Sequence, residues 1–140
     1  MAGGENKRVT RQFIGVAWNN DRYDGAREHL APDFVDHTPF GQETSDEFLA
    51  RITWFRDGFP DWRITADDML SDGDFVIARW TGRGTHRGTF RGIAPTRRAA
   101  TVMGIAIDRV IAGKRVEGWA LLDTFGLLHQ LGATVQAPAS

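Results

Sequence analysis

The chain contains no cysteine. This absence excludes disulfides, thiolate nucleophiles and the cysteine-based zinc sites that stabilise many small domains. The sequence also has no apolar run long enough to cross a membrane, and its first residues, MAGGENKR, have no signal-peptide core. We therefore expect a cytoplasmic protein.

The sequence also has little excess charge of either sign. Its formal net charge is −1, which argues against nucleic acid or an anionic membrane surface as the main partner, because both require a concentrated positive field. Hydrophobic residues make up 41 % of the chain and charged residues 25 %, which is ordinary for a globular domain. A length of 140 residues fits one domain with a real core.

The first half of the chain has helical periodicity. Val9, Phe13, Val16 and Ala17 line one face of a first helix, and residues 25–30 predict a short second one. A third helix begins with a capping box formed by Thr44 and Glu47. Its apolar residues recur as a single stripe on one face, which predicts packing on a sheet: Phe48, Ile52, Phe55 and Phe59.

The second half has strand periodicity. Apolar and polar residues alternate over 62–66 and again over 75–123, with Gly and Pro between the runs, which predicts an antiparallel meander. Helices followed by strands, without β–α–β alternation, indicate an α+β fold with its helices on one side of the sheet. We expect a flexible N-terminus over 1–8, one domain over 9–132 and a tail over 133–140.

Small residues share one face of two predicted neighbouring strands. Gly104 and Ala106 have the same parity on one strand, as do Gly118 and Ala120 on the next. This pattern fits either a space kept open beneath the helices or close packing of the helices on the sheet. Parity alone does not tell which face is concave.

Two histidines are candidates for proton transfer, because an imidazole titrates near neutral pH. They are His37 and His86, and the alternative for each is a buried ring bonded to backbone. Asn19 could donate to a ligand carbonyl or end the first helix. The spacing of the histidines predicts no metal site. Aromatic residues that would line a pocket, or simply fill the core, are Trp18, Phe34, Phe55, Phe59, Trp62, Trp80 and Phe90.

Four segments together resemble the SnoaL-like polyketide cyclases of the NTF2-like superfamily. They are APDFVDHTP at 31–39, FPDWRIT at 59–65, the run from Ser71 to Thr96 that contains GTHRG and GIAPT, and the LLHQLG ending at Gly132. The resemblance implies a cone-shaped barrel in which a strongly curved antiparallel or mixed sheet wraps around helices. It also implies an apolar pocket, cofactor-free chemistry and a homodimer formed through the outer sheet surface.

The resemblance also implies site residues, from which this sequence departs. The family's acid–base Asp on the last strand corresponds here to Ala120, and an assisting His on the preceding strand falls near Ala106. Asp123 would replace that Asp only if the register is shifted, and otherwise begins the turn into the last helix. Arg97 stands where the family usually has Gly, which predicts either a different turn or a negative φ there. It also predicts an arginine near the pocket mouth that would meet an acidic substrate.

Two functions remain open from the sequence. The first is a cofactor-free enzyme of secondary metabolism that cyclises or isomerises a polyketide-like molecule, with His37 and His86 moving protons. The second is a non-catalytic module that binds a small hydrophobic ligand in the same pocket. The missing Asp favours the second function, whereas the two histidines favour the first.

Overall fold

The computed structural model describes residues 2–20 and 23–139. The helical segments are α1 (Ala2–Phe13), the π-helical η1 (Ile14–Trp18), α2 (Tyr23–Arg27), α3 (Ser45–Gly58) and α4 (Thr124–Gln130). The strands are β1 (Leu30–Thr38), β2 (Gly41–Glu43), β3 (Arg63–Asp72), β4 (Phe75–Thr85), β5 (Ala99–Ile111) and β6 (Lys114–Leu122). The predicted α+β class is confirmed.

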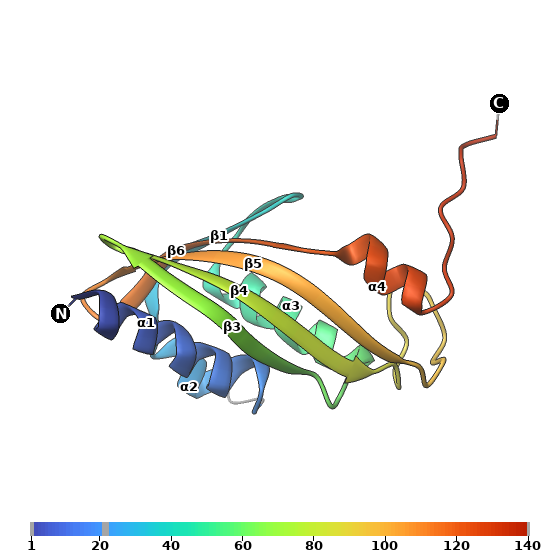
Figure 1. Cartoon of the computed structure of the whole chain (residues 1–140), viewed down its shortest axis with the longest axis horizontal. Coiled ribbons are helices and arrows are strands. Elements are labelled where there is room, and N and C mark those ends of the chain that lie inside the picture. Colours follow the sequence, from blue (N-terminus) through green and yellow to red (C-terminus); the bar gives the residue numbers. More distant parts are fainter. Residues whose placement is uncertain (1, 21–22, 140) are drawn as a thin grey trace.

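The strands form one mixed sheet in the order β2-β1-β6-β5-β4-β3. The meander from β3 to β6 is antiparallel, as the alternation predicted, whereas β1 pairs with β6 in parallel. Figure 1 shows the strands bending over the helices. The sheet therefore has an inner face, on which α1 and α3 pack, and an outer face that no helix covers among the residues described.

Helix α3 has the predicted start and the predicted buried face. The Thr44 hydroxyl accepts a hydrogen bond from the Glu47 amide (3.3 Å), and the Glu47 carboxylate accepts one from the Thr44 amide (3.0 Å). This reciprocal cap satisfies two amides that the helix leaves without partners. The apolar stripe lies in the core and comprises Phe48, Leu49, Ile52, Phe55 and Phe59.

Helix α1 begins earlier than the apolar periodicity predicts. The pattern starts at Val9, but the helix extends back to Ala2 and buries Asn6 as well as Thr10. Because these two residues are polar, hydrophobic periodicity cannot register them. The flexibility expected of residues 1–8 and the domain bounds stay predictions, and Met1 lies outside the described residues. The short second helix lies over Tyr23–Arg27, and Leu30 already belongs to β1.

The small residues of the inner face serve both of the alternatives that the sequence left open. Ala106 and Ala120 pair across β5 and β6 and line a pocket beneath the helices. Gly104 instead lets the Trp80 ring lie directly on β5, and Gly82 does the same for the Trp62 ring on β4. A side chain at either glycine would overlap an indole ring.

We predict that Gly82→Ala destabilises the fold by about 2–3 kcal/mol, because the added methyl group overlaps the Trp62 indole, which is almost fully buried. Gly4→Ala is the matched control, since it lies in α1 with no atom within 4 Å of the new methyl group. It should be neutral or slightly stabilising. Urea denaturation measures both, and equal stability of the two variants would contradict the prediction.

Candidate functional site

An inner pocket lies between the sheet and the helices, with a volume of about 90 Å³. Ligand pockets usually have several hundred Å³, so the pocket is narrow in this conformation. Helices α1 and α3, η1 and five of the strands provide its walls. The lining residues are Thr10, Phe13, Ile14, Trp18, Asp36, Phe48, Arg51, Phe55, Trp62, Ile64, Ala78, Trp80, Ala106, Asp108, Arg115, Trp119, Ala120 and Leu122.

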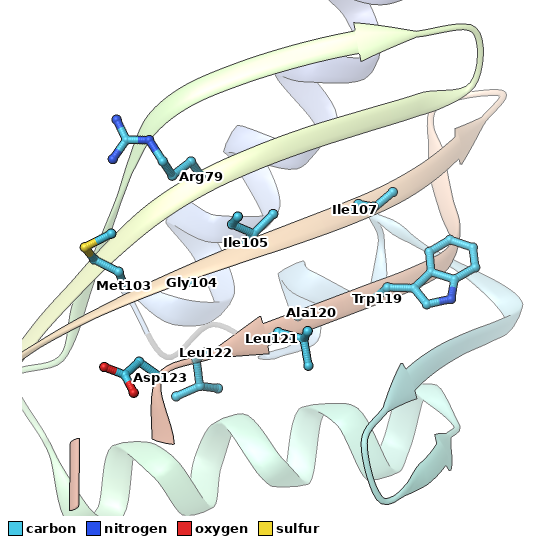
Figure 2. A pocket seen from close by; sticks show the side chains of 10 residues that line it. All are labelled: Arg79, Met103, Gly104, Ile105, Ile107, Trp119, Ala120, Leu121, Leu122 and Asp123. Atoms are coloured by element: carbon cyan, nitrogen blue, oxygen red, sulfur yellow. The ribbon is translucent and has the colours of Figure 1, made fainter. Parts of the chain in front are cut away.

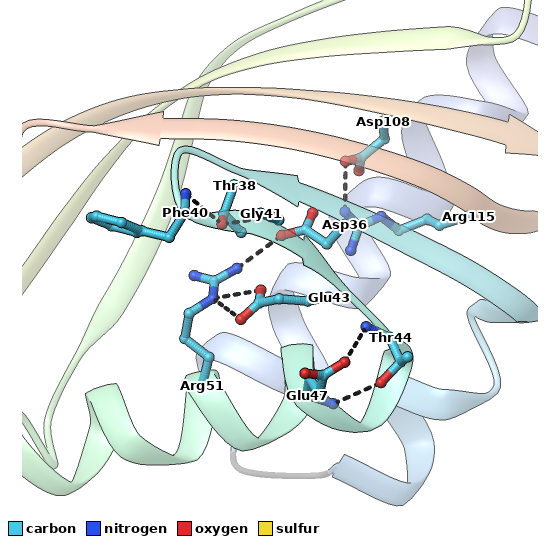
Figure 3. Close-up of polar contacts among 10 residues, drawn as sticks. All are labelled: Asp36, Thr38, Phe40, Gly41, Glu43, Thr44, Glu47, Arg51, Asp108 and Arg115. Carbon is cyan, nitrogen blue, oxygen red and sulfur yellow. Dashed lines mark hydrogen bonds and ion pairs between the residues drawn. The ribbon is translucent and has the colours of Figure 1, made fainter.

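The polar residues of the lining form one cluster, whose arginines lie over the rings of Phe13 and Phe48, and a separate aromatic group surrounds Phe55. The Phe55 ring contacts those of Trp18 and Trp62, with centroids 6.1 and 4.6 Å apart. The polar cluster comprises Thr10, Asp36, Arg51, Asp108 and Arg115, and all but Thr10 appear in Figure 3. This separation suits a ligand with an apolar body and one polar group.

Asp36 is the inward carboxylate of β1. Its residue surface is 2 % exposed, and the Arg51 guanidinium donates to it at 2.9 Å. Burial raises the pKa of Asp36 to about 6 from 3.8, even though Arg51 and Arg115 lower it. Glu43 and Asp108 add smaller contributions that raise the pKa. A carboxyl with a pKa near 6 can both accept and return a proton close to neutral pH.

The second carboxylate of the cluster, Asp108, is fully engaged. It accepts from the Arg115 guanidinium at 2.7 Å and from the Thr10 hydroxyl at 2.9 Å. The Arg115 guanidinium lies over the rings of Phe13 and Phe34, at 4.4 and 5.2 Å from their centroids. A buried positive charge therefore lies in the pocket wall, held by a carboxylate and by aromatic faces.

Some of the residues predicted for the site line the pocket and others do not. Those in the lining are Trp18, Phe55, Trp62, Trp80, Ala106 and Ala120. Phe34, Phe59 and Phe90 lie in the apolar core outside that lining. Asn19 fastens η1 to β3, because its amide group donates to the Ile64 carbonyl (3.0 Å) and accepts from the Ile64 amide (2.7 Å).

His37 lies on the outer face of the sheet and not in the inner lining. Its Nε2 is 2.7 Å from the Glu117 carboxylate, and its ring stacks on Trp119 with centroids 4.9 Å apart. Neighbours in a strand face opposite ways, so the inward position at this point of β1 belongs to Asp36. His37, a predicted proton-transfer residue, therefore lies outside the lining of the inner pocket.

His86 is fully buried, but it also lies outside the lining of the inner pocket. Its Nδ1 accepts from the Thr96 amide (3.1 Å), and its backbone exchanges hydrogen bonds with Arg97 and Arg98. The ring stacks on Phe59, with centroids 5.5 Å apart. This environment matches the alternative of a buried histidine, which here anchors the two ends of the loop between β4 and β5.

Two further candidates have local roles. Asp123 caps α4, since its carboxylate accepts from the Gly126 amide at 2.8 Å. Arg97 has a φ of 62°, so the expectation of a negative φ was wrong. The arginine adopts the left-handed conformation that glycine takes more easily, and the hydrogen bond of its amide to the His86 carbonyl (2.9 Å) holds it there. Neither residue lines the inner pocket.

Two arginines of the pocket were not predicted from the sequence, whereas Asp108 could be: it has the parity of Gly104 and Ala106, and a shifted register would make it a candidate for the missing Asp. Arg115 lies next to an irregularity in the β5–β6 register, which breaks the parity of β6 there. Arg51 lies on α3 one turn from Phe48, and the sequence alone predicts a surface residue there, because its carboxylate partners come from other elements.

Neither a metal site nor a membrane-spanning helix is found among the described residues. No group of three or more His, Asp or Glu side chains in that part of the chain could hold a metal ion. None of the helices formed by those residues combines the length and the apolar character needed to span a membrane.

The profile of one protein family, described as SnoaL-like polyketide cyclase, matches residues 8–131. The chain belongs to the SnoaL-like polyketide cyclase family. Members of this family bind small-molecule ligands, which agrees with a pocket enclosed by helices and sheet. No curated protein matches the chain in sequence.

Solved structures of SnoaL-like proteins have the same fold. AclR of Streptomyces galilaeus, a candidate hydroxylase, is 27 % identical with a TM-score of 0.85, covering 92 % of this chain and 96 % of AclR. IdmH of Streptomyces antibioticus, a candidate polyketide cyclase, is 29 % identical with a TM-score of 0.84, covering 91 % and 99 %. A candidate cyclase from Jannaschia sp. CCS1 supports the NTF2-like fold alone, at 18 % identity, TM-score 0.86 and 95 % coverage of both chains.

The raised pKa of Asp36 predicts a pH-dependent stability. Below about pH 4 the carboxyl is largely protonated in both states. Between about pH 4 and 6 the unfolded chain ionises first, so the stability falls across this range and levels off above about pH 6. Relative to Asp36→Asn, the wild-type protein should therefore lose up to about 3 kcal/mol of stability between about pH 4 and 7. Urea denaturation of both proteins across this range measures the difference, and parallel pH curves would contradict it.

Proposed function

We propose that this SnoaL-like protein catalyses cofactor-free proton transfer at carbon in a small, polyketide-like molecule, leading to cyclisation or isomerisation. The observation that carries the proposal is Asp36, a buried carboxyl with a pKa near 6 in the wall of the inner pocket. The residue replaces the histidines that the sequence suggested.

In this mechanism the ionised Asp36 removes a proton from the carbon next to a carbonyl group and later returns it. The negative charge that develops on the carbonyl oxygen is stabilised by the buried Arg115 guanidinium, which is already held in place by Asp108. The aromatic residues bind the apolar body of the molecule and exclude water. The pocket thus has a base, a positive charge and a shaped apolar wall.

The comparisons support this class of chemistry. IdmH, which is 29 % identical, is a candidate polyketide cyclase, and the family is named for the same activity. AclR is a candidate hydroxylase, so one fold can serve more than one chemistry. The proposal therefore rests on the side chains of the pocket and not on the fold.

The proposal predicts exchange of carbon-bound hydrogen in a simple probe. α-Tetralone, a small bicyclic ketone, should exchange its α-protons for deuterium in D2O faster with the wild-type protein than in buffer. Asp36→Asn should lose about 100-fold or more of this acceleration, the usual contribution of a general base. Proton NMR of the ketone measures the exchange rate.

His37→Ala is the matched control, because it removes a titratable group from the neighbouring position on the outer face of β1. It should retain the wild-type rate. Equal rates for Asp36→Asn and the wild-type protein would overturn the role of Asp36. Binding of the ketone without any exchange would favour the second candidate, a ligand-binding module, for which Ala120 and Ala106 in the pocket lining are the supporting observation.

We also propose that two copies of the chain pair through the outer face of the sheet. The middle of this face is apolar and exposed: Met103, Ile105 and Leu121 are 59 %, 54 % and 65 % exposed. They line a hollow of about 500 Å³ (Figure 2). A continuous apolar patch on the central strands suits a two-fold interface, in which the same surface serves both copies.

The double variant Ile105→Lys with Leu121→Lys should therefore sediment as a monomer, since it places charges in the centre of the patch. The wild-type protein should sediment as a dimer at micromolar concentration. Phe40→Lys is the control, because Phe40 is 89 % exposed on the β1–β2 hairpin and lies outside this hollow. A monomeric wild-type protein in analytical ultracentrifugation would contradict the proposal.

A further inference from the structure

Arg51 lies at the boundary between the inner pocket and solvent. Its side chain is 31 % exposed although it contributes to the pocket lining, whereas the side chain of its partner Asp36 is 3 % exposed. Figure 3 shows Arg51 reaching from α3 toward β1 and β2. The residue therefore forms part of the wall that separates the candidate acid–base group from water.

The contacts of Arg51 join three elements. Its Nε donates to both oxygens of Glu43 on β2, at 2.8 and 3.2 Å, and its Nη2 donates to Asp36 on β1 at 2.9 Å. The guanidinium also lies over the Phe48 ring of α3, 5.2 Å from its centroid. One planar group thus fixes a carboxylate inside the pocket and another on the adjacent hairpin.

The β1–β2 hairpin, which carries Glu43, adjoins this arginine, and of its residues Asp36 lines the pocket. Strand β2 contains three residues, Gly41–Glu43, at the edge of the sheet, and pairs only with β1 among the described strands. Its turn carries the exposed Phe40. Helix α3, in contrast, is held by its buried apolar stripe. Because the pocket is narrow, a ligand of ordinary size requires part of its wall to move, and the partly exposed Arg51 is a lining residue that an ion pair ties to this hairpin.

We infer that Arg51 is a positioning residue and a latch: it orients the Asp36 carboxylate and, through its ion pair with Glu43, fastens the β1–β2 hairpin to α3 beside the inner pocket. The orientation of Asp36 for catalysis rests on the proposed function, whereas the fastening of the hairpin does not. A ligand would reach the pocket after the ion pair between Arg51 and Glu43 opens.

The charges around Asp36 give opposite signs for two variants of the same latch. Arg51 on α3 and Arg115 on β6 lower the pKa of Asp36, while Glu43 on β2 and Asp108 on β5 raise it. Arg51→Met should therefore raise this pKa above about 6, and Glu43→Gln should lower it. The two signs differ because the two side chains that are neutralised carry opposite charges near the same carboxyl.

The latch is tested without a substrate. Arg51→Met and Glu43→Gln should both increase amide hydrogen exchange of residues 40–43 by about fivefold, the usual effect of losing one partly buried ion pair. Both should also speed the association of 1-aminoanthracene, a neutral fluorescent probe of apolar pockets. The Asp36 carboxyl is titrated by carbon-13 NMR in the same proteins, where the two variants should shift in opposite directions.

Two further variants make the test specific. Arg51→Lys keeps the charge and should return the pKa of Asp36 toward the wild-type value, while the hairpin still exchanges faster because an ammonium cannot hold Glu43 in the same two-bond geometry. Arg27→Gln breaks an exposed ion pair with Asp46 and should change none of these measurements. Unchanged exchange and probe association in Arg51→Met and Glu43→Gln would overturn the latch, even if Asp36 proves catalytic. Faster exchange together with an inactive Asp36 would leave the latch standing and end the proposed function.

Discussion

The buried ion pair between Asp108 and Arg115 is the interaction on which the inner pocket depends. Both side chains are less than 10 % exposed, and their 2.7 Å contact joins β5 to β6 beneath the helices. A lone charge in that position would be strongly unfavourable, so each partner requires the other. Thr10 ties the pair to α1, and three phenylalanine rings surround the guanidinium. The helices and the sheet are thereby joined around the inner pocket, which is narrow in this conformation.

This pair also determines the character of the neighbouring carboxyl. Because Arg115 is already paired with Asp108, it compensates the charge of Asp36 only in part. Burial therefore raises the pKa of Asp36 by more than the two arginines lower it. The three carboxylates in this region consequently differ: Asp108 is paired inside, Glu43 is paired at the rim, and Asp36 lies between them in the pocket wall. Distinct environments for similar groups are the usual way in which proteins assign distinct proton affinities.

Local rules predicted the fold better than they predicted the site. The capping box at Thr44 and the apolar stripe of α3 depend on residues within a few turns, so the sequence contains all the information needed. Predicting the pocket requires knowing which sheet face is concave. His37 and Asp36 are neighbours in a strand and therefore face opposite sides, so only one of them can point into the pocket. The roles of Arg51 and Arg115 depend on carboxylate partners from other elements, and a local sequence pattern does not contain that information. The resemblance to the family predicted the fold and its pocket, while the alanine at position 120 indicated that the acid–base residue of the family is not at its usual position.

The parallel pairing of β1 with β6 has a consequence for how the protein is made. Residues near position 36 find their strand neighbour only near position 118, after most of the chain has left the ribosome. The segment that carries Asp36 can pair with β2 at once, but its other edge stays unpaired until β6 is synthesised, whereas the strands of the meander can pair in order. Assembly of the pocket is a late event, and chains that stop before β6 would have helices and a partial sheet but no enclosed interior.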